Sequence, residues 1–184
     1  MRAVVAFCAA ALLVLAVAAD SHSDKMAKYH KRTGAKWLAH LEKEAGVYKL
    51  PSGMLFRVKT KGTGSKSPEA NDDCDVHYTG TLRDGTKFDS SVDRGSPATF
   101  KPTQVIRGWT EALQLMREGD KWIVYIPYDM AYGEHGSPPN IPGYAPLQFE
   151  MELLKVKAGG KSADKASLEL KEKIGKSYDE IQTS

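Results

Sequence analysis

The sequence has little cysteine, with only Cys8 and Cys74 among its 184 residues. Cys8 lies in an apolar N-terminal run, so a chain cleaved behind that run would keep Cys74 alone and could form no internal disulfide. The protein could therefore exist in an oxidising compartment, but it would gain no stability there from an internal disulfide. We interpret Cys74 as a buried, inert thiol and not as a nucleophile, because no neighbouring residue would obviously lower its pKa.

Several common chemistries also lack the residues they need. The five histidines have no metal-ligand spacing with one another or with Cys74, so we expect no metal site. Gly160-Lys161-Ser162 lacks the first glycine of a phosphate loop, and neither a nucleophile elbow nor a catalytic Ser-His pattern is present. We therefore expect a function that needs no metal, no nucleotide or other cofactor, and no covalent intermediate.

One long apolar run, residues 3–19, follows Arg2 and ends in small residues. This pattern predicts a signal peptide over residues 1–19, cut after Ala18 or Ala19, and hence a protein that is secreted or lies in the lumen of the secretory pathway. The alternative is an uncleaved membrane anchor, which we disfavour because the run is near the lower length limit for spanning a bilayer. After cleavage we expect no membrane partner.

Neither basic nor acidic residues are in large excess, since the sequence has 26 of the first and 23 of the second. Residues 1–19 hold one of the basic residues and none of the acidic ones, so the cleaved chain would be closer still to neutrality. Because both signs are interspersed, the sequence argues against nucleic acid as a partner.

Residues 20–49 predict an N-terminal helix, centred on residues 24–45. The residues spaced three or four apart along one side of it are Met26, Tyr29, Thr33, Trp37, Leu41 and Ala45, and all but Thr33 are apolar. The helix could be a stalk or self-association surface, or a partly solvated helix that lies against its own domain. We favour the second interpretation, because Gly34 weakens the helix, Thr33 interrupts the stripe and the segment is short for a coiled coil.

The main domain is expected over residues 50–157 and begins at the turn Pro51-Ser52-Gly53. Patterns typical of strands cover residues 54–60, 72–82, 121–127 and 147–153, and Asp84-Gly85 predicts a hairpin turn. The third of these runs is apolar on both sides, which is typical of a central strand. With one helix between the second and third strands, the fold class is α+β, an antiparallel sheet wrapped around one short helix.

The helix of the main domain is expected over residues 104–116, with Gly119 ending it. Its apolar stripe consists of Ile106, Trp109, Leu113 and Met116. Trp109 lies in the first turn next to Gly108, where its ring could be a buried anchor or could form the floor of a pocket between helix and sheet. The helix alone does not separate these two interpretations.

Two segments have no regular period. Residues 129–146 contain four prolines and three glycines, and a loop this long in a compact domain is typical of a functional lid. Residues 158–184 form a polar C-terminal tail, in which Ala166, Leu170 and Ile174 could make one weak helical stripe. We expect this tail to be mainly a solvated linker.

Five motifs occur in order along the main domain: VHYTG at 76–80, GTKFDSS at 85–91, QVIRGW at 104–109, AYG at 131–133 and LQFEMEL at 147–153. With them the chain resembles the FKBP-type peptidyl-prolyl cis-trans isomerases. The turn Leu50-Pro51-Ser52-Gly53 after a helix, together with GWTEALQLM, is similar to the Mip (macrophage infectivity potentiator) branch. The N-terminal helix is much shorter than the dimerising stalk of the bacterial members, so we expect a monomer.

The resemblance implies a half-barrel sheet around the helix and an enzyme that isomerises X-Pro bonds of polypeptides, accelerates protein folding and is inhibited by macrolides of the FK/rapamycin type. It implies catalytic roles for Tyr78, Asp89 and Tyr132. It implies substrate-binding roles for Phe88, Arg94, Phe100, Val105, Ile106, Trp109, Ile141 and Phe149. Arg107 and Asn140 depart from residues common in the family, and both bear on substrate preference more than on catalysis.

Two questions stay open from the sequence. Asp89 could mainly order its loop by pairing with Arg94 and the Tyr78 hydroxyl, or it could stabilise the twisted amide electrostatically. The aromatic residues could also form a non-catalytic module that binds prolyl peptides, or a chaperone whose N-terminal helix holds clients.

Overall fold

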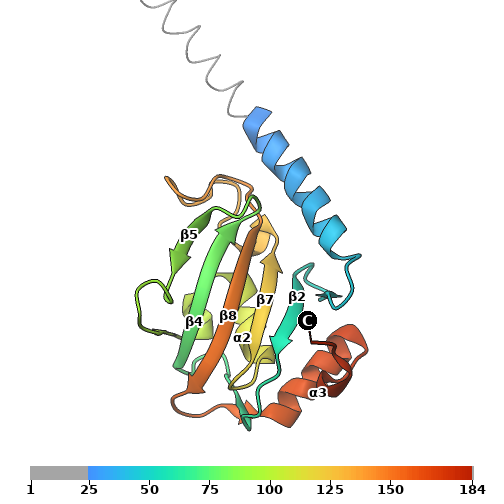
Figure 1. The fold of residues 1–184 in the computed structure, drawn as a ribbon, viewed down its shortest axis with the longest axis vertical. Helices are drawn as coiled ribbons and strands as arrows, with labels where there is room; N and C mark the ends of the chain where they lie inside the picture. Colours follow the sequence, from blue (N-terminus) through green and yellow to red (C-terminus); the bar gives the residue numbers. More distant parts are fainter. Residues whose placement is uncertain (1–24, 184) are drawn as a thin grey trace, which may run out of the picture.

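An antiparallel sheet curls over the short helix α2 (Arg107–Leu115; Figure 1). The computed structural model describes residues 25–183. The main sheet has the strand order β1-β2-β7-β8-β4-β5, with β6 also paired to β4, and all of its pairings are antiparallel. The expected α+β class, an antiparallel sheet around one helix preceded by an N-terminal helix, is confirmed.

After the N-terminal helix, six strands follow one another along the chain, and the remaining helices, helical turns and strands come behind them. In order they are β1 (Tyr48–Lys49), β2 (Leu55–Thr60), β3 (Lys66–Ser67), β4 (Cys74–Leu82), β5 (Lys87–Ser90), β6 (Ala98–Phe100), η1 (Pro102–Gln104), α2 (Arg107–Leu115), β7 (Lys121–Ile126), η2 (Tyr128–Met130), β8 (Leu147–Val156), β9 (Lys161–Ser162), α3 (Ala163–Ile174) and η3 (Tyr178–Glu180). The expected hairpin at Asp84-Gly85 joins β4 to β5.

Helix α2 buries the apolar face that the sequence predicts. Trp109 and Leu113 face the core, and Met116, just beyond the helix, is fully buried. The helix ends at Leu115, so the expected stop at Gly119 was wrong. Met116 already has extended backbone angles, and the positive φ of Gly119 serves the turn that leads into β7.

The two long central strands place alternate side chains in the core, because successive residues of a strand point to opposite faces. Tyr78 of β4 is buried, as are Phe149 and Met151 of β8. The register sets Tyr78 opposite Met151 and Gly80 opposite Phe149. Aromatic residues from neighbouring strands therefore meet on the concave face above α2.

The described part of the N-terminal helix covers residues 25–41 and projects past the end of the sheet (Figure 1). Near its C-terminal end the Trp37 ring meets Tyr125 edge-on, with 5.7 Å between ring centroids. Leu41 and Leu55 complete this small cluster beside the main core. The helix thus lies against its own domain through its second half, while Met26 and Tyr29 are exposed.

The C-terminal segment is folded, so the expectation of a mainly solvated linker was wrong. The weak stripe predicted in it lies on α3, where Ala166 and Leu170 are buried and Ile174 packs on the core. Beyond α3, Tyr178 is buried, and its hydroxyl donates a hydrogen bond to the buried Asp120. A few well-spaced apolar residues were enough to hold a polar sequence on the domain, because each one fills a core position.

The apolar run of residues 3–19, interpreted above as a signal peptide, lies outside the described residues. Within residues 25–183, no helix has both the length and the apolarity that crossing a membrane requires. The same residues contain no group of three or more His, Cys, Asp or Glu side chains arranged to hold a metal ion.

Candidate active site

A hollow of about 530 Å³ opens between the sheet and the start of α2. The residues that line it are Tyr78, Phe88, Asp89, Phe100, Gln104, Val105, Ile106, Trp109, Tyr132 and Phe149. All of them except Gln104 are residues for which the sequence implied a site role. Gln104 was missed, although its position in the QVIRGW motif was a signal that could have pointed to it.

Trp109 forms the floor of this hollow. It lies in the first turn of α2 and is 4% exposed. Its ring is met edge-on by Tyr78 at 4.9 Å, by Phe149 at 5.2 Å and by Phe100 at 5.6 Å between centroids. The indole is therefore both a buried anchor and a pocket floor, and edge-to-face packing of this kind holds it in one orientation.

One wall of the hollow depends on the absence of a side chain at Gly80. A Cβ at this position would lie 2.6 Å from the Phe88 ring and 2.7 Å from the Phe149 ring. Because glycine leaves this space free, the two rings pack directly on the backbone of β4 and meet each other edge-on at 5.5 Å.

The polar rim is a network of three side chains. The Tyr78 hydroxyl donates a 2.5 Å hydrogen bond to Oδ2 of Asp89, and Nη2 of Arg94 donates to the Tyr78 hydroxyl at 2.9 Å. Nη1 of Arg94 forms an ion pair with Oδ1 of Asp89. The pairing expected for Asp89 is thus present, and Arg94 stands behind the rim without lining the hollow itself.

The network shifts the pKa values of its members. Partial burial acts to raise the pKa of Asp89, but hydrogen bonds from Tyr78 and Arg94 outweigh it, so this pKa lies below its ordinary value. Burial raises the pKa of Tyr78, and the hydrogen bond to Asp89 raises it further. Burial, assisted by the charge of Asp89, also raises the pKa of Tyr132. At neutral pH the rim therefore carries one carboxylate and two protonated phenols.

Ile106 lines the hollow and has a backbone N–H with no hydrogen-bond acceptor among residues 25–183. This residue immediately precedes α2. The first N–H groups of a helix have no intrahelical partner, so they are available to a ligand. The Thr110 hydroxyl holds the preceding turn in place with a 2.5 Å hydrogen bond to the Pro102 carbonyl.

The loop at residues 128–146 contributes Tyr132, whose side chain lines the hollow and is 41% exposed. Ile141 of the same loop differs from expectation, because it is 5% exposed, belongs to the hydrophobic core and does not line the hollow. Its backbone forms two hydrogen bonds with Ser137, of 2.8 and 2.9 Å, so it anchors the loop from below.

Cys74 does not line this hollow, although it lies opposite Phe100 in the sheet. Burial, together with the nearby carboxylates of Asp72, Asp73 and Asp75, raises the pKa of its thiol to about 12. The thiol is therefore protonated at neutral pH, which agrees with the interpretation of an inert cysteine.

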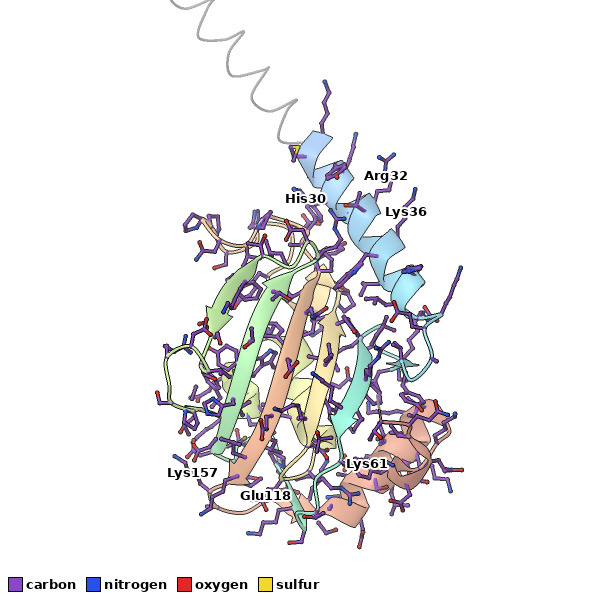
Figure 2. The ribbon with its side chains drawn as sticks, in the orientation of Figure 1. His30, Arg32, Lys36, Lys61, Glu118 and Lys157 are labelled. Atoms are coloured by element: carbon purple, nitrogen blue, oxygen red, sulfur yellow. The ribbon has the colours of Figure 1, made fainter. Side chains whose placement is uncertain are left out.

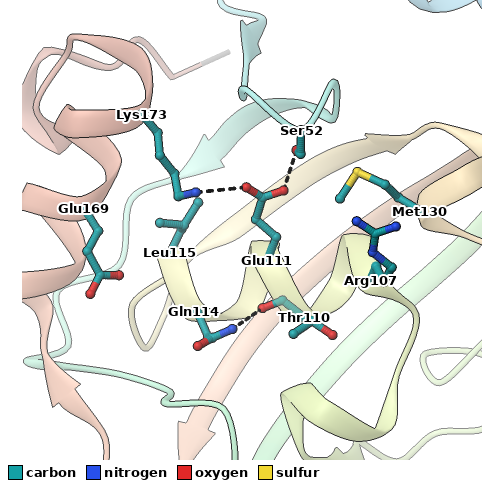
Figure 3. Close-up of a pocket in the computed structure, with 9 residues that line it drawn as sticks. All are labelled: Ser52, Arg107, Thr110, Glu111, Gln114, Leu115, Met130, Glu169 and Lys173. Carbon is teal, nitrogen blue, oxygen red and sulfur yellow. Dashed lines mark hydrogen bonds and ion pairs between the residues drawn. The ribbon is translucent and has the colours of Figure 1, made fainter.

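A second hollow, of about 470 Å³, lies on the other side of α2 (Figure 3). Its centre is Glu111, which accepts hydrogen bonds from the Ser52 hydroxyl and from Nζ of Lys173, the latter at 3.2 Å. This hollow has no aromatic residue in its lining, and its central carboxylate is already paired. It is therefore unsuited to an apolar ring.

Comparisons with known proteins agree with this geometry. A family model described as FKBP-type peptidyl-prolyl cis-trans isomerase matches residues 64–154. The macrophage infectivity potentiator of Trypanosoma cruzi is 52% identical over 143 residues, which cover 78% of this chain and 73% of that protein. FkpA of Aeromonas hydrophila, an FKBP-type isomerase, is 49% identical over 144 residues, which cover 78% of this chain and 53% of that protein.

Solved structures give the same result. The crystal structure of FkpA from Escherichia coli matches with a TM-score of 0.77 and 34% identity, over 88% of this chain and 73% of that one. A peptidyl-prolyl cis-trans isomerase from Pseudomonas syringae matches with a TM-score of 0.67 and 39% identity, over 71% of this chain and 96% of that one. The fold and the sequence similarity together define a prolyl isomerase. The chain belongs to the FKBP-type peptidyl-prolyl cis-trans isomerases, and it is a Mip-like enzyme of that family.

Proposed function

We propose that this hollow binds an X-Pro segment of a polypeptide with the proline ring lying on Trp109, and that isomerisation takes place there. The observation that supports this most directly is the aromatic floor and wall, built from Trp109, Phe149 and Tyr78 around a space with a polar rim. A proline ring is apolar and compact, so an aromatic hollow of this kind suits it.

The reaction requires little chemistry from the protein. Rotation about a peptide bond has a barrier of about 18 to 20 kcal/mol, because the planar amide loses its resonance when it twists. A twisted amide is also less polar than a planar one. An environment that removes water from the amide therefore disfavours the planar ground state relative to the transition state. A reduction of about 7 kcal/mol accelerates the reaction by about five decades.

A few fixed hydrogen bonds then hold the substrate in the turned geometry. We assign the Ile106 N–H as donor to a substrate carbonyl, supported by its lack of an acceptor within the described chain. The Tyr132 hydroxyl is a second donor, supported by its raised pKa and its place at the edge of the hollow. Val105, Phe88 and Phe100 line the remaining wall.

Asp89 and Tyr78 act together at the rim. Proton transfer is not needed, since isomerisation has no net proton change, so Asp89 acts through its charge and through the order it gives to Tyr78 and Arg94. Ile141 supports the loop from the core and does not contact the substrate directly. Macrolides of the FK/rapamycin type would occupy the same aromatic hollow and inhibit the enzyme.

The remaining assignments concern the protein as a whole. We infer that it is exported and monomeric, and that its partners are proline-containing polypeptides with no nucleic acid. The apolar run of residues 3–19 supports export, and the near-balance of basic and acidic residues supports the absence of nucleic acid.

Packing of Trp37 against Tyr125 supports a monomer, because it covers part of the helix face that a stalk would use. Sedimentation at micromolar and millimolar concentrations tests this, and a concentration-dependent dimer would contradict it.

The alternative function for the same hollow is a module that binds prolyl peptides without catalysing their isomerisation. NMR exchange spectroscopy on an Ala-Leu-Pro-Phe type peptide separates the two possibilities, using the chain from residue 20 onward. We expect faster cis/trans exchange, abolished by rapamycin. Peptide binding with exchange at the spontaneous rate would favour the module instead.

A further inference from the structure

The N-terminal helix reaches the active-site loop through Lys31. Its Nζ lies 5.7 Å from the centroid of the Tyr128 ring and 5.5 Å from that of the Tyr144 ring. The two rings are 5.2 Å apart, so one ammonium group contacts both ends of the loop. Both distances are within the range of cation–π attraction.

Gly34, one helical turn further on, allows this close approach. It is buried, and a Cβ at this position would lie 2.9 Å from Cδ of Pro146 and 3.8 Å from the Tyr144 carbonyl oxygen. Any other residue would move the helix away from the loop. Glycine has a low helix propensity, and its presence at position 34 is explained by the close packing of the helix against the loop.

The two tyrosines hold the backbone of the residue after Tyr132. The Gly133 N–H donates to the Tyr128 carbonyl at 2.8 Å, and the Tyr144 N–H donates to the Gly133 carbonyl at 3.0 Å. Tyr144 has a φ of +60°, a conformation that a bulky residue adopts only when its surroundings impose it. The position of Tyr132 therefore depends on how Tyr128 and Tyr144 are placed.

We propose that the N-terminal helix is part of the isomerase machinery, and that Lys31 is a positioning residue that acts through Tyr128 and Tyr144 on Tyr132. The described part of the helix, residues 25–41, contributes no side chain to the hollow itself. Its role is to hold the loop so that the Tyr132 hydroxyl stands where the substrate needs a donor. This rests on the proposed role of Tyr132 in the prolyl site.

The same helix offers a matched control. Figure 2 shows Arg32 and Lys36 directed away from the domain. Within residues 25–183, Lys36 takes part in no ion pair, side-chain hydrogen bond or cation–π contact. Lys36→Ala thus removes the same charge from the same helix without touching the loop.

We expect Lys31→Ala to lower kcat/KM in the peptide exchange assay by about three- to fivefold, the range that an exposed cation–π contact supports. Lys31→Arg should restore activity because it keeps a cation over the rings, and Lys36→Ala should leave activity unchanged. Gly34→Ala should lower activity while raising helix propensity, which separates docking of the helix from its formation. The Gly133 amide resonance should shift in Lys31→Ala and not in Lys36→Ala.

The route through Tyr132 has its own test. In a Tyr132→Phe background, Lys31→Ala should have no further effect on kcat/KM, because the hydroxyl that it positions is gone. A persistent loss in that background, or wild-type activity in Lys31→Ala, would overturn the proposal while leaving the isomerase function intact. A wild-type protein without turnover would overturn the isomerase function and this proposal with it.

Discussion

The phenol of Tyr78 packs on Trp109 at the floor of the hollow, while its hydroxyl donates a 2.5 Å hydrogen bond to Asp89 at the rim. One side chain therefore links the apolar floor to the charged edge. Because Arg94 pairs with the same carboxylate, the rim is held in one arrangement before any substrate arrives. Fixed polar groups of this kind stabilise a transition state without having to reorganise.

Replacing the rim carboxylate tests its contribution to turnover. We expect Asp89→Leu to lower kcat/KM by about tenfold, which corresponds to about 1.4 kcal/mol, because the Tyr78 hydroxyl and Arg94 lose their common partner. Folding should be kept, since Asp89 and Arg94 are both partly exposed. Asp93→Leu is the control, because Asp93 pairs with Lys87 outside the hollow. Unchanged turnover in Asp89→Leu would remove Asp89 from the catalytic residues.

The acid limit of activity follows from the same carboxyl group. Its pKa is lowered in the folded protein, so the network is complete above the ordinary carboxyl pKa of about 3.9 and is lost as the pH falls through the lower, native value. We expect kcat/KM to be constant from about pH 8 to about pH 5 and to fall only below about pH 4. In Asp89→Asn the side chain cannot titrate, so kcat/KM should not fall in this way below about pH 4. A fall centred near pH 6 would show that another group controls the rate.

The buried hydrogen bond between Tyr178 and Asp120 joins the C-terminal segment to the start of β7. Asp120 has no exposed surface, and its other partners are the N–H groups of Gly62 at 2.7 Å and Arg117 at 2.9 Å. We expect Tyr178→Phe to lower the free energy of unfolding by about 1 to 3 kcal/mol, measured by urea denaturation at pH 7. Tyr29→Phe, at an exposed hydroxyl, should have almost no effect.

The Tyr178→Phe loss should also depend on pH. Burial raises the pKa of Asp120, so this group costs no stability at low pH, and the free energy of unfolding falls as the pH rises from the ordinary carboxyl pKa of about 3.9 to the higher native value, where the decrease is complete. The Tyr178 hydroxyl offsets part of this cost by donating to the carboxylate. The loss should therefore be larger at pH 7 than at pH 4, and an equal loss at both would contradict this assignment.

Two leucines of α3 test whether the C-terminal segment is part of the core. Leu170 has no exposed surface, whereas Leu168 of the same helix is 62% exposed. We expect Leu170→Ala to lower the free energy of unfolding by about 2 to 5 kcal/mol, because it leaves a cavity. Leu168→Ala should stay within about 0.5 kcal/mol. Equal, small losses from both would show that the segment is a dispensable tail.

Local patterns were sufficient for most of the fold, whereas the family resemblance pointed to most of the residues that line the hollow. The alternation at Phe149 and Met151 and the helical spacing of Trp109 and Leu113 depend only on neighbouring residues, and each correctly assigned a buried face. Short strands such as β1, β3 and β9 were missed, because two residues carry no period and pair only when the chain brings a partner to them.

Ile141 shows where a motif is not enough for a site. The resemblance implied contact with the substrate, yet the backbone of Ile141 is hydrogen-bonded to Ser137 and its side chain belongs to the core. Gln104 was missed although it belongs to the QVIRGW motif, because the resemblance implied no role for it.

The amino-acid order by itself determined the class of this protein, because periodicity within each segment decides which face is buried and the motifs of the main domain are specific to one family. Only the tertiary structure decided that the polar C-terminal segment is folded, that Gly34 lets a helix approach Pro146, and that Lys31 reaches Tyr128 and Tyr144. The contacts of Gly34 and Lys31 join residues about 100 positions apart in the sequence. The C-terminal segment is held by single apolar side chains that pack on a core formed by distant residues. No local pattern encodes such contacts, because they form only when the whole chain has packed.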